Sequence, residues 1–299
     1  MRHNLASEAG CFHAAYPSFA WEKVECKTLH PLVHPVHDTA AGGVGAVTGN
    51  GHDYVAQAAG LITETFGSFP SVTGVTSERS VGVAAFGGGG ILGPNEYTLQ
   101  INTNFTGTTS VCAGHSGCTV WQQFIYSPDY QTKGEAAVFM QYWLIGWGRG
   151  KCPKPFASAG AGSGDCYTNS AYVAAPDMPI TDLAELTISG AVVAGGNDTV
   201  TFNNGSEAYS VSGSDSMLDV SAVWTQSEFN IVGNAGGSRA DFNKGSSITV
   251  KSALTDGSTA APTCVPNDGS TGESNNLTLA KKCTTAGGAT PYIEFVEKN

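Results

Sequence analysis

The chain has 299 residues, of which only 13% are charged, and its formal net charge is −11 with Lys and Arg together at 14. This charge provides no basic stripe for nucleic acid, and no apolar run approaches the length of a membrane span. With 39 Gly residues, the composition favours short strands and tight turns over long amphipathic helices. We therefore expect a secreted all-β protein that has no nucleic-acid or membrane partner.

The first 90 residues do not show a regular strand pattern. Residues 29–38 contain three histidines, but two prolines prevent the helix that would bring them onto one face, so we expect a surface loop and no metal site. Residues 53–62 predict one short helix, and the Ser-, Thr- and Gly-rich stretch from 63 to 90 predicts a linker or extended arm. Residues 1–4 lack an apolar segment, so a signal peptide would have been removed or would precede this chain.

The eight cysteines fall into four successive close pairs, which predicts four local disulfides and an oxidising, extracellular compartment. The pairs are Cys11 with Cys26, Cys112 with Cys118, Cys152 with Cys166, and Cys264 with Cys283. Glycosylation sequons at Asn104, Asn197, Asn204 and Asn276 are compatible with secretion.

From residue 95 onward, short segments of alternating or β-branched residues are separated by Gly, Asn, Asp or Ser turns, which is typical of a β-sandwich. The predicted strands are residues 97–102, 120–126, 137–145, 186–188, 199–202, 208–211, 229–232, 247–250 and 291–296. We expect an N-terminal extension at 1–90, which would be a propeptide or a subdomain, and a two-sheet antiparallel sandwich domain at 91–299.

Two of these strands carry residue types that can hydrolyse a peptide bond. Gln122 and Gln123 are adjacent on one strand, and Glu228 lies on another. Successive strand residues point to opposite faces, so only one of the two glutamines can share a face with Glu228. A carboxylate can activate water while an amide N–H stabilises an oxyanion.

The order of three motifs resembles the glutamic peptidases of the eqolisin type over roughly residues 95–255. The motifs are WQQF at 121–124, FMQYW at 139–143 and TQSEFNI at 225–231. This resemblance implies a concanavalin-like or jelly-roll sandwich of two bent antiparallel sheets, with the active site on a concave face. It also implies a metal-independent endopeptidase that needs no cofactor and acts at acidic pH on a polypeptide substrate, and we expect a monomer.

The resemblance also implies roles for individual residues. Glu228 would be the general base, and Gln122 or Gln123 would donate to the oxyanion. An apolar residue just before the catalytic position favours Gln122, to which we give slightly more weight, whereas proximity to the following aromatic residue favours Gln123. The substrate-binding candidates are Gln141, Trp143, Tyr126 and Asn230.

Some features depart from that family. Its Trp-Val-Gly segment has no clear counterpart, the nearest stretch being residues 102–105, and its core lacks a region like residues 1–90. Neprosin-type endopeptidases, which are more distantly similar, have a glutamate where this chain has glutamine. Alternative functions are a non-catalytic module that binds glycans or peptides, with Trp side chains available for stacking, and a polysaccharide lyase or hydrolase of similar fold.

Overall fold

The computed structural model describes residues 8–18, 20–30, 50, 52–84, 88–104, 107–148, 150–160, 163–266 and 271–299. The strands are β1 (Gly10–Ala15), β2 (Glu22–Val24), β3 (Tyr54–Gln57), β4 (Glu64–Thr73), β5 (Glu78–Gly82), β6 (Gly93–Pro94), β7 (Tyr97–Thr103), β8 (Thr119–Thr132), β9 (Glu135–Ile145), β10 (Ala157–Ser158), β11 (Cys166–Asn169), β12 (Val173–Ala175), β13 (Thr187–Ala191), β14 (Asn197–Asn203), β15 (Glu207–Ser214), β16 (Gln226–Gly233), β17 (Ser238–Phe242), β18 (Ser247–Thr255), β19 (Thr263–Pro266), β20 (Ser274–Asn275), β21 (Thr278–Ala286) and β22 (Tyr292–Lys298). The helical turns are the short 3₁₀ segments η2 (Ser110–Cys112), η3 (Ile180–Glu185), η4 (Asp215–Met217) and η5 (Val220–Ala222).

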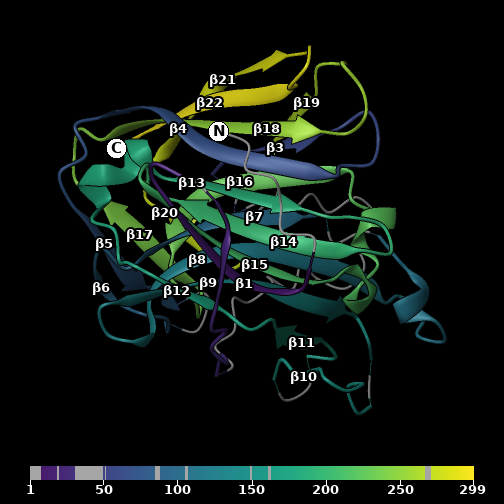
Figure 1. The fold of residues 1–299 in the computed structure, drawn as a ribbon. Helices are drawn as coiled ribbons and strands as arrows, with labels where there is room; N and C mark the ends of the chain where they lie inside the picture. Colours follow the sequence, from purple (N-terminus) through teal and green to yellow (C-terminus); the bar gives the residue numbers. More distant parts are fainter. Residues whose placement is uncertain are drawn as a thin grey trace.

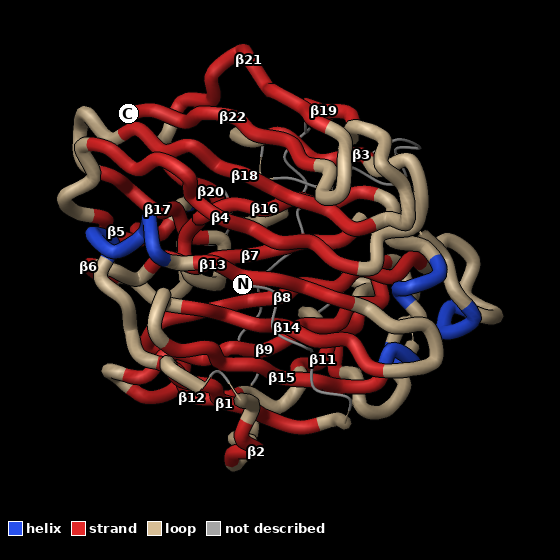
Figure 2. Tube along the Cα trace, turned by 45° about the horizontal axis from the view of Figure 1, so that its top comes forward, coloured by secondary structure: helices blue, strands red, loops and turns tan. Residues whose placement is uncertain are grey.

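Two large antiparallel sheets form the layers of the molecule (Figure 1). The first has the order β2-β1-β15-β14-β13-β4-β18-β22-β21, and its strands lie side by side in Figure 2. The second has the order β10-β11-β9-β8-β7-β16-β3-β19, with β12 also paired to β9. The all-β sandwich expected from the sequence is confirmed.

The sheets are in close contact where large aromatic rings of the second sheet lie over glycines of the first. A Cβ added to Gly67 on β4 would lie 2.3 Å from the ring of Phe229, and one added to Gly190 on β13 would lie 2.4 Å from the ring of Phe124. Both rings are fully buried. Because Phe229 points into the space between the sheets, the preceding residue, Glu228, is placed on the outer face of the second sheet.

Each of the nine strands predicted from residue 95 onward is present, with ends that differ by a few residues. The alternating pattern was informative there because each strand has one face toward the core.

Two predictions for the first 90 residues were wrong. Residues 53–62 contain the strand β3 rather than a helix, because β3 pairs with β16 and β19 on its two edges. Residues 63–90 contain β4 and β5 rather than a linker. Gly67 of β4, one of the residues that predicted a loop, is a packing position: it gives room to Phe229, which no local sequence pattern reveals.

Strands from the first 90 residues are built into the same sheets as the later ones. β4 lies between β13 and β18 near the middle of the first sheet, and β1 pairs with β15. The expected boundary at residue 90 therefore does not separate the described strands into an extension and a sandwich.

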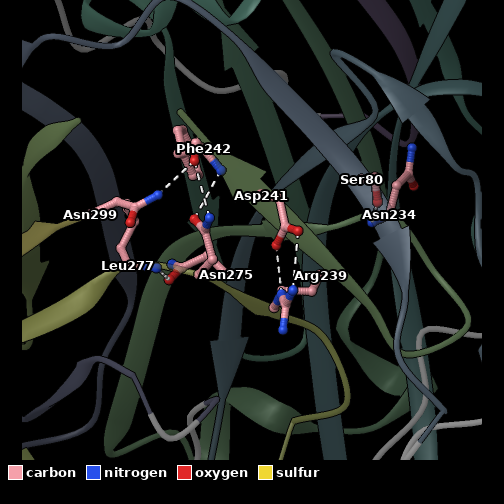
Figure 3. Close-up of polar contacts among 9 residues, drawn as sticks. Ser80, Asn234, Arg239, Asp241, Phe242, Asn275, Leu277 and Asn299 are labelled. Carbon is pink, nitrogen blue, oxygen red and sulfur yellow. Dashed lines mark hydrogen bonds and ion pairs between the residues drawn. The ribbon is translucent and has the colours of Figure 1, made fainter. Parts of the chain in front are cut away.

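A small third sheet of order β20-β17-β5-β6 closes one end of the molecule. In Figure 3, the Asn299 side chain donates to the Phe242 carbonyl at 2.7 Å, and the Asn275 side chain accepts from the Leu277 amide at 3.0 Å. The same view shows the paired contacts between Arg239 and Asp241. The Asn299 bond ties the C-terminus to β17, and β17 pairs in parallel with β20, which carries Asn275.

All four predicted disulfides are present, with the pairing expected from proximity. Among the described residues, no helix is long and apolar enough to cross a membrane.

Candidate functional site

A row of polar side chains crosses three neighbouring strands of the second sheet. Gln123 on β8 is in register with Asn102 on β7, and Asn102 is in register with Glu228 on β16. Gln141 on β9 extends the row beyond Gln123. Residues in register on adjacent strands have their side chains on the same face, so these four residues share the outer face of the sheet.

Gln122 and Tyr126 lie on the opposite face of β8. The Gln122 side chain donates to Met140 Sδ at 3.6 Å and interacts with Asp198 of the first sheet. The Tyr126 ring stacks on Phe202, with ring centroids 3.9 Å apart. The structure thus brings Gln123, Gln141, Trp143, Asn230 and Glu228 to one face and directs Gln122 and Tyr126 into the core.

The orientation of the Gln123 amide is fixed by Trp143. The indole Nε1 donates to Gln123 Oε1 at 3.2 Å and to Gln141 Oε1 at 2.9 Å. An indole N–H can only donate, so the Gln123 oxygen must face it and the Gln123 NH₂ must point the other way. That NH₂ donates to Gln100 Oε1 at 3.2 Å, on the side toward Glu228. An amide nitrogen carries two hydrogens, which leaves a second donor for a ligand.

Glu228 contacts side chains from three other parts of the chain. Asn102 Nδ2 donates to Glu228 Oε2 at 2.8 Å, and the Thr271 hydroxyl donates to Oε1 at 3.4 Å. The Asp53 carboxyl group, which directly precedes β3, is hydrogen bonded to that of Glu228. Glu228 and Asp53 are 2% and 1% exposed, so the two carboxyl groups meet in a region shielded from water.

A third carboxyl group is connected to this pair through Asn230. Asn230 Nδ2 lies 2.9 Å from Glu297 Oε1 and 3.4 Å from Asp53 Oδ2. Asn275 Nδ2 donates to the other Glu297 oxygen at 3.1 Å. Glu297 belongs to β22 of the first sheet, so this buried network joins the two sheets at the site.

Burial dominates the electrostatics of the three carboxyl groups. It raises the pKa of Glu228 well above its ordinary value, and the neighbouring Asp53 charge raises it further, whereas the Asn102 hydrogen bond lowers it. Burial raises the pKa of Asp53 to about 6 and that of Glu297 to about 8, against hydrogen bonds that lower both. The ion pairs between described residues involve none of the three. Amides rather than cations therefore stabilise whichever carboxyl group is ionised.

Aromatic side chains on the same face are buried rather than available for stacking. Trp143 packs in a cluster with Trp121 and Tyr167, with the Trp143 and Tyr167 ring centroids 5.3 Å apart. Trp143 is 1% exposed. Its contacts are with the side-chain amides of Gln123 and Gln141 and with the neighbouring rings, so its role is to hold the Gln123 amide in place.

Within the described ranges, no group of three or more His, Cys, Asp or Glu residues is arranged to hold a metal ion. Most of the histidine-bearing stretch at 29–38, including His34 and His37, lies outside the described residues.

Sequence reasoning missed Asp53 and Glu297. Asp53 was assigned to the predicted helix, where it carried no signal. Glu297 did carry one, since it has the same parity as the core residues Ile293 and Phe295 on its strand, and an acid at a core position is unusual.

Comparison with protein-family models and with curated proteins found no match. Comparison with solved structures found similarity to SCP-B, a member of the eqolisin family of peptidases in complex with the tripeptide Ala-Ile-His. The TM-score is 0.29 and the identity 12%, over 82% of this chain and 97% of that one. Similarity at this TM-score and identity does not establish the activity of this chain.

Proposed function

We propose that this protein is a secreted endopeptidase of the glutamic type, in which Glu228 is the general base and Gln123 is the oxyanion donor. The observation that carries the proposal is the row Gln123–Asn102–Glu228 on one sheet face, with the Gln123 NH₂ held toward Glu228 by Trp143. Gln123 and Glu228 are two strands apart, about 10 Å between backbones, and Asn102 on the strand between them donates to Glu228.

The chemistry needs only these groups and water. The ionised Glu228 would take a proton from water as the water oxygen attacks the peptide carbonyl carbon, and the carbonyl electrons move to oxygen. The free N–H of Gln123 would donate to this oxyanion. Glu228 would then pass the proton to the amide nitrogen as the C–N bond breaks, which restores the starting carboxylate.

Substrate entry requires this face to open. Gln123 is fully buried and Glu228 nearly so, and both Asp53 and Thr271 contact Glu228. The Thr271 hydrogen bond is long at 3.4 Å and hence weak. A polypeptide would displace Thr271 more easily than Asp53, which directly precedes a strand that is paired on both edges.

The alternatives receive less support. A glycan-binding module would present aromatic rings to solvent, but the rings beside the amide row are buried. A two-carboxylate glycosidase needs its carboxyl groups about 5 Å or more apart, on opposite sides of the scissile bond. The hydrogen-bonded pair of Asp53 and Glu228 is too close for that arrangement.

The four disulfides are consistent with an extracellular protein. The sequence-based expectation of acidic pH becomes more specific: because the Asp53 pKa is about 6, the carboxyl pair begins to ionise in mildly acidic solution. We propose activity from mildly acidic to neutral pH.

The test is cleavage of denatured casein and of a peptide library across pH 3–8, with the wild type and Glu228→Gln assayed side by side. We expect cleavage by the wild type and none by the variant. Equal cleavage by both proteins would remove Glu228 from the mechanism. No cleavage by either, together with binding of intact peptide or glycan by a folded protein, would favour the binding module.

A further inference from the structure

We infer that Asp53 and Glu228 hold a single proton between them, and that Asp53 is the positioning residue that sets the protonation of Glu228. This inference rests on the proposed function for its catalytic meaning, but the proton-sharing itself can be measured without activity. It assigns a role to a residue outside the part of the chain that resembles any peptidase motif.

The geometry of β3 carries the inference. Gln57 and Ala56 pair with Gln226 and Ser227 of β16, and continuing this register places Asp53 beside Asn230, next to Glu228 on the outer face. β19 pairs with the other edge of β3, so the backbone leading to Asp53 is held on both sides. Asp53 lies in the bend that directly precedes β3, and the next residue, Tyr54, is paired with Pro266, so the sheet holds the backbone from which the Asp53 side chain reaches Glu228.

A hydrogen bond between two carboxyl groups requires a proton on one of them, because two carboxylates are both acceptors. The groups that face the pair are amides, a hydroxyl and further acids: Asn102 and Thr271 against Glu228, and Asn230 against Asp53. Glu273 adds negative charge near Glu228, whereas the Glu297 carboxyl group, with its pKa raised to about 8 by burial, is neutral in acidic solution. No described Lys or Arg forms an ion pair with either group. One shared proton is the arrangement that avoids two adjacent buried charges.

The shared proton allows Glu228 to act as a base in a site that would otherwise keep it protonated. When the proton resides on Asp53, Glu228 is a carboxylate and can take a proton from water that displaces the weak Thr271 contact. When it moves back to Glu228, the Asp53 carboxylate is stabilised by Asn230. The pair thus titrates in two macroscopic steps that belong to both residues. The first step frees a base and defines the acidic limb of activity, and the second defines an upper limit.

Asp53→Asn tests the inference, with Glu297→Gln as the matched control. The Asn amide cannot share a proton, removes the neighbouring charge and donates to Glu228, so the proton affinity of Glu228 should fall at least tenfold. In protein labelled with ¹³C at the glutamate carboxyl carbons, the signal that disappears in Glu228→Gln should titrate at least about one pH unit lower in Asp53→Asn than in wild type. Glu297→Gln, which removes a buried acid that contacts Asn230 but not Glu228, should leave that midpoint unchanged.

The pH profile of kcat/KM is the second readout. The upper limit that the second step sets should be lost in Asp53→Asn, which has no second carboxyl group to ionise, while Asp53→Glu should restore it, provided that circular dichroism shows both variants folded. A variant that fails to fold leaves the wild-type titration as the deciding measurement: two steps for Glu228 support the inference, and a single step at its ordinary pKa overturns it.

The outcomes separate the inference from the proposed function. If the Glu228 midpoint shifts in Asp53→Asn but the wild-type protein cleaves no substrate, the proton-sharing pair is supported and the peptidase function is rejected. If cleavage depends on Glu228 but the Glu228 midpoint is the same in wild type and Asp53→Asn, the peptidase function is supported and the shared proton is rejected.

Discussion

The indole N–H of Trp143 lies 3.2 Å from Gln123 Oε1, and this contact decides which end of the Gln123 amide faces Glu228. Without it, the two ends of the amide could exchange and present a carbonyl oxygen to a developing oxyanion. Trp143 also donates to Gln141, which in turn donates to Asn169 at 2.7 Å. Trp143 therefore sets the orientation of both glutamine amides, Gln123 and Gln141.

Trp143→Phe should lower kcat with little change in KM, because the ring remains but the donor that orients Gln123 is lost. We expect a decrease of up to about 100-fold, as for a misplaced catalytic group. Trp224→Phe is the control: Trp224 is also fully buried, but its N–H donates to the Gln226 carbonyl, away from the row. Equal kcat for wild type and Trp143→Phe in steady-state assays would contradict the orienting role.

Gln123→Met and Gln122→Met form a matched pair, since the two residues are adjacent on β8 and both fully buried. Methionine keeps the length of the side chain and removes the amide. We expect Gln123→Met to lose about 10²–10³-fold in kcat, the usual cost of deleting an oxyanion donor. Gln122→Met should retain activity, and the reverse result would assign the oxyanion to Gln122.

The protein should be most stable in acid and lose stability as the pH rises. Burial raises the pKa of Glu78 to about 9 and those of Asp198 and Glu297 to about 8, so the folded state holds protons that the unfolded chain releases above about pH 4. For each such proton, the free energy of unfolding falls by about 1.4 kcal/mol per pH unit until the folded-state pKa is reached.

Urea unfolding at pH 4, 6, 8 and 9 measures this dependence. Glu78→Gln, which removes one of the groups, should give a shallower decline between pH 4 and 9. A free energy of unfolding that stays constant or increases over this range would show that these carboxyl groups ionise normally in the folded protein.

Gly67→Ala should destabilise the sandwich and displace Glu228 through its neighbour Phe229. The added methyl group would overlap the buried Phe229 ring, and we expect a loss of about 1–3 kcal/mol, typical of overpacking. Gly150→Ala, where a Cβ meets nothing within 4 Å, is the control. Thermal unfolding would give the melting temperature of both variants. Equal melting temperatures for Gly67→Ala and Gly150→Ala would show that the Phe229 ring does not pack against Gly67.

The sequence by itself determined the features that depend only on residues close together in the chain. Period-two alternation located the strands that carry Gln123 and Glu228, close spacing identified the disulfide pairs, and side-chain chemistry selected a carboxyl and an amide as partners. Strand parity also required that only one of Gln122 and Gln123 share a face with Glu228.

Only the tertiary structure decided the rest, because it depends on register between strands that are far apart in the chain. The pairing of β8 with β7 and of β7 with β16 places Gln123 rather than Gln122 beside Glu228. The pairing of β3 with β16 brings Asp53 across more than 170 residues of sequence to the same point. No local sequence pattern predicts these contacts, because they depend on the order of strands in the sheet. They depend also on the packing of aromatic rings against glycines of the opposite sheet.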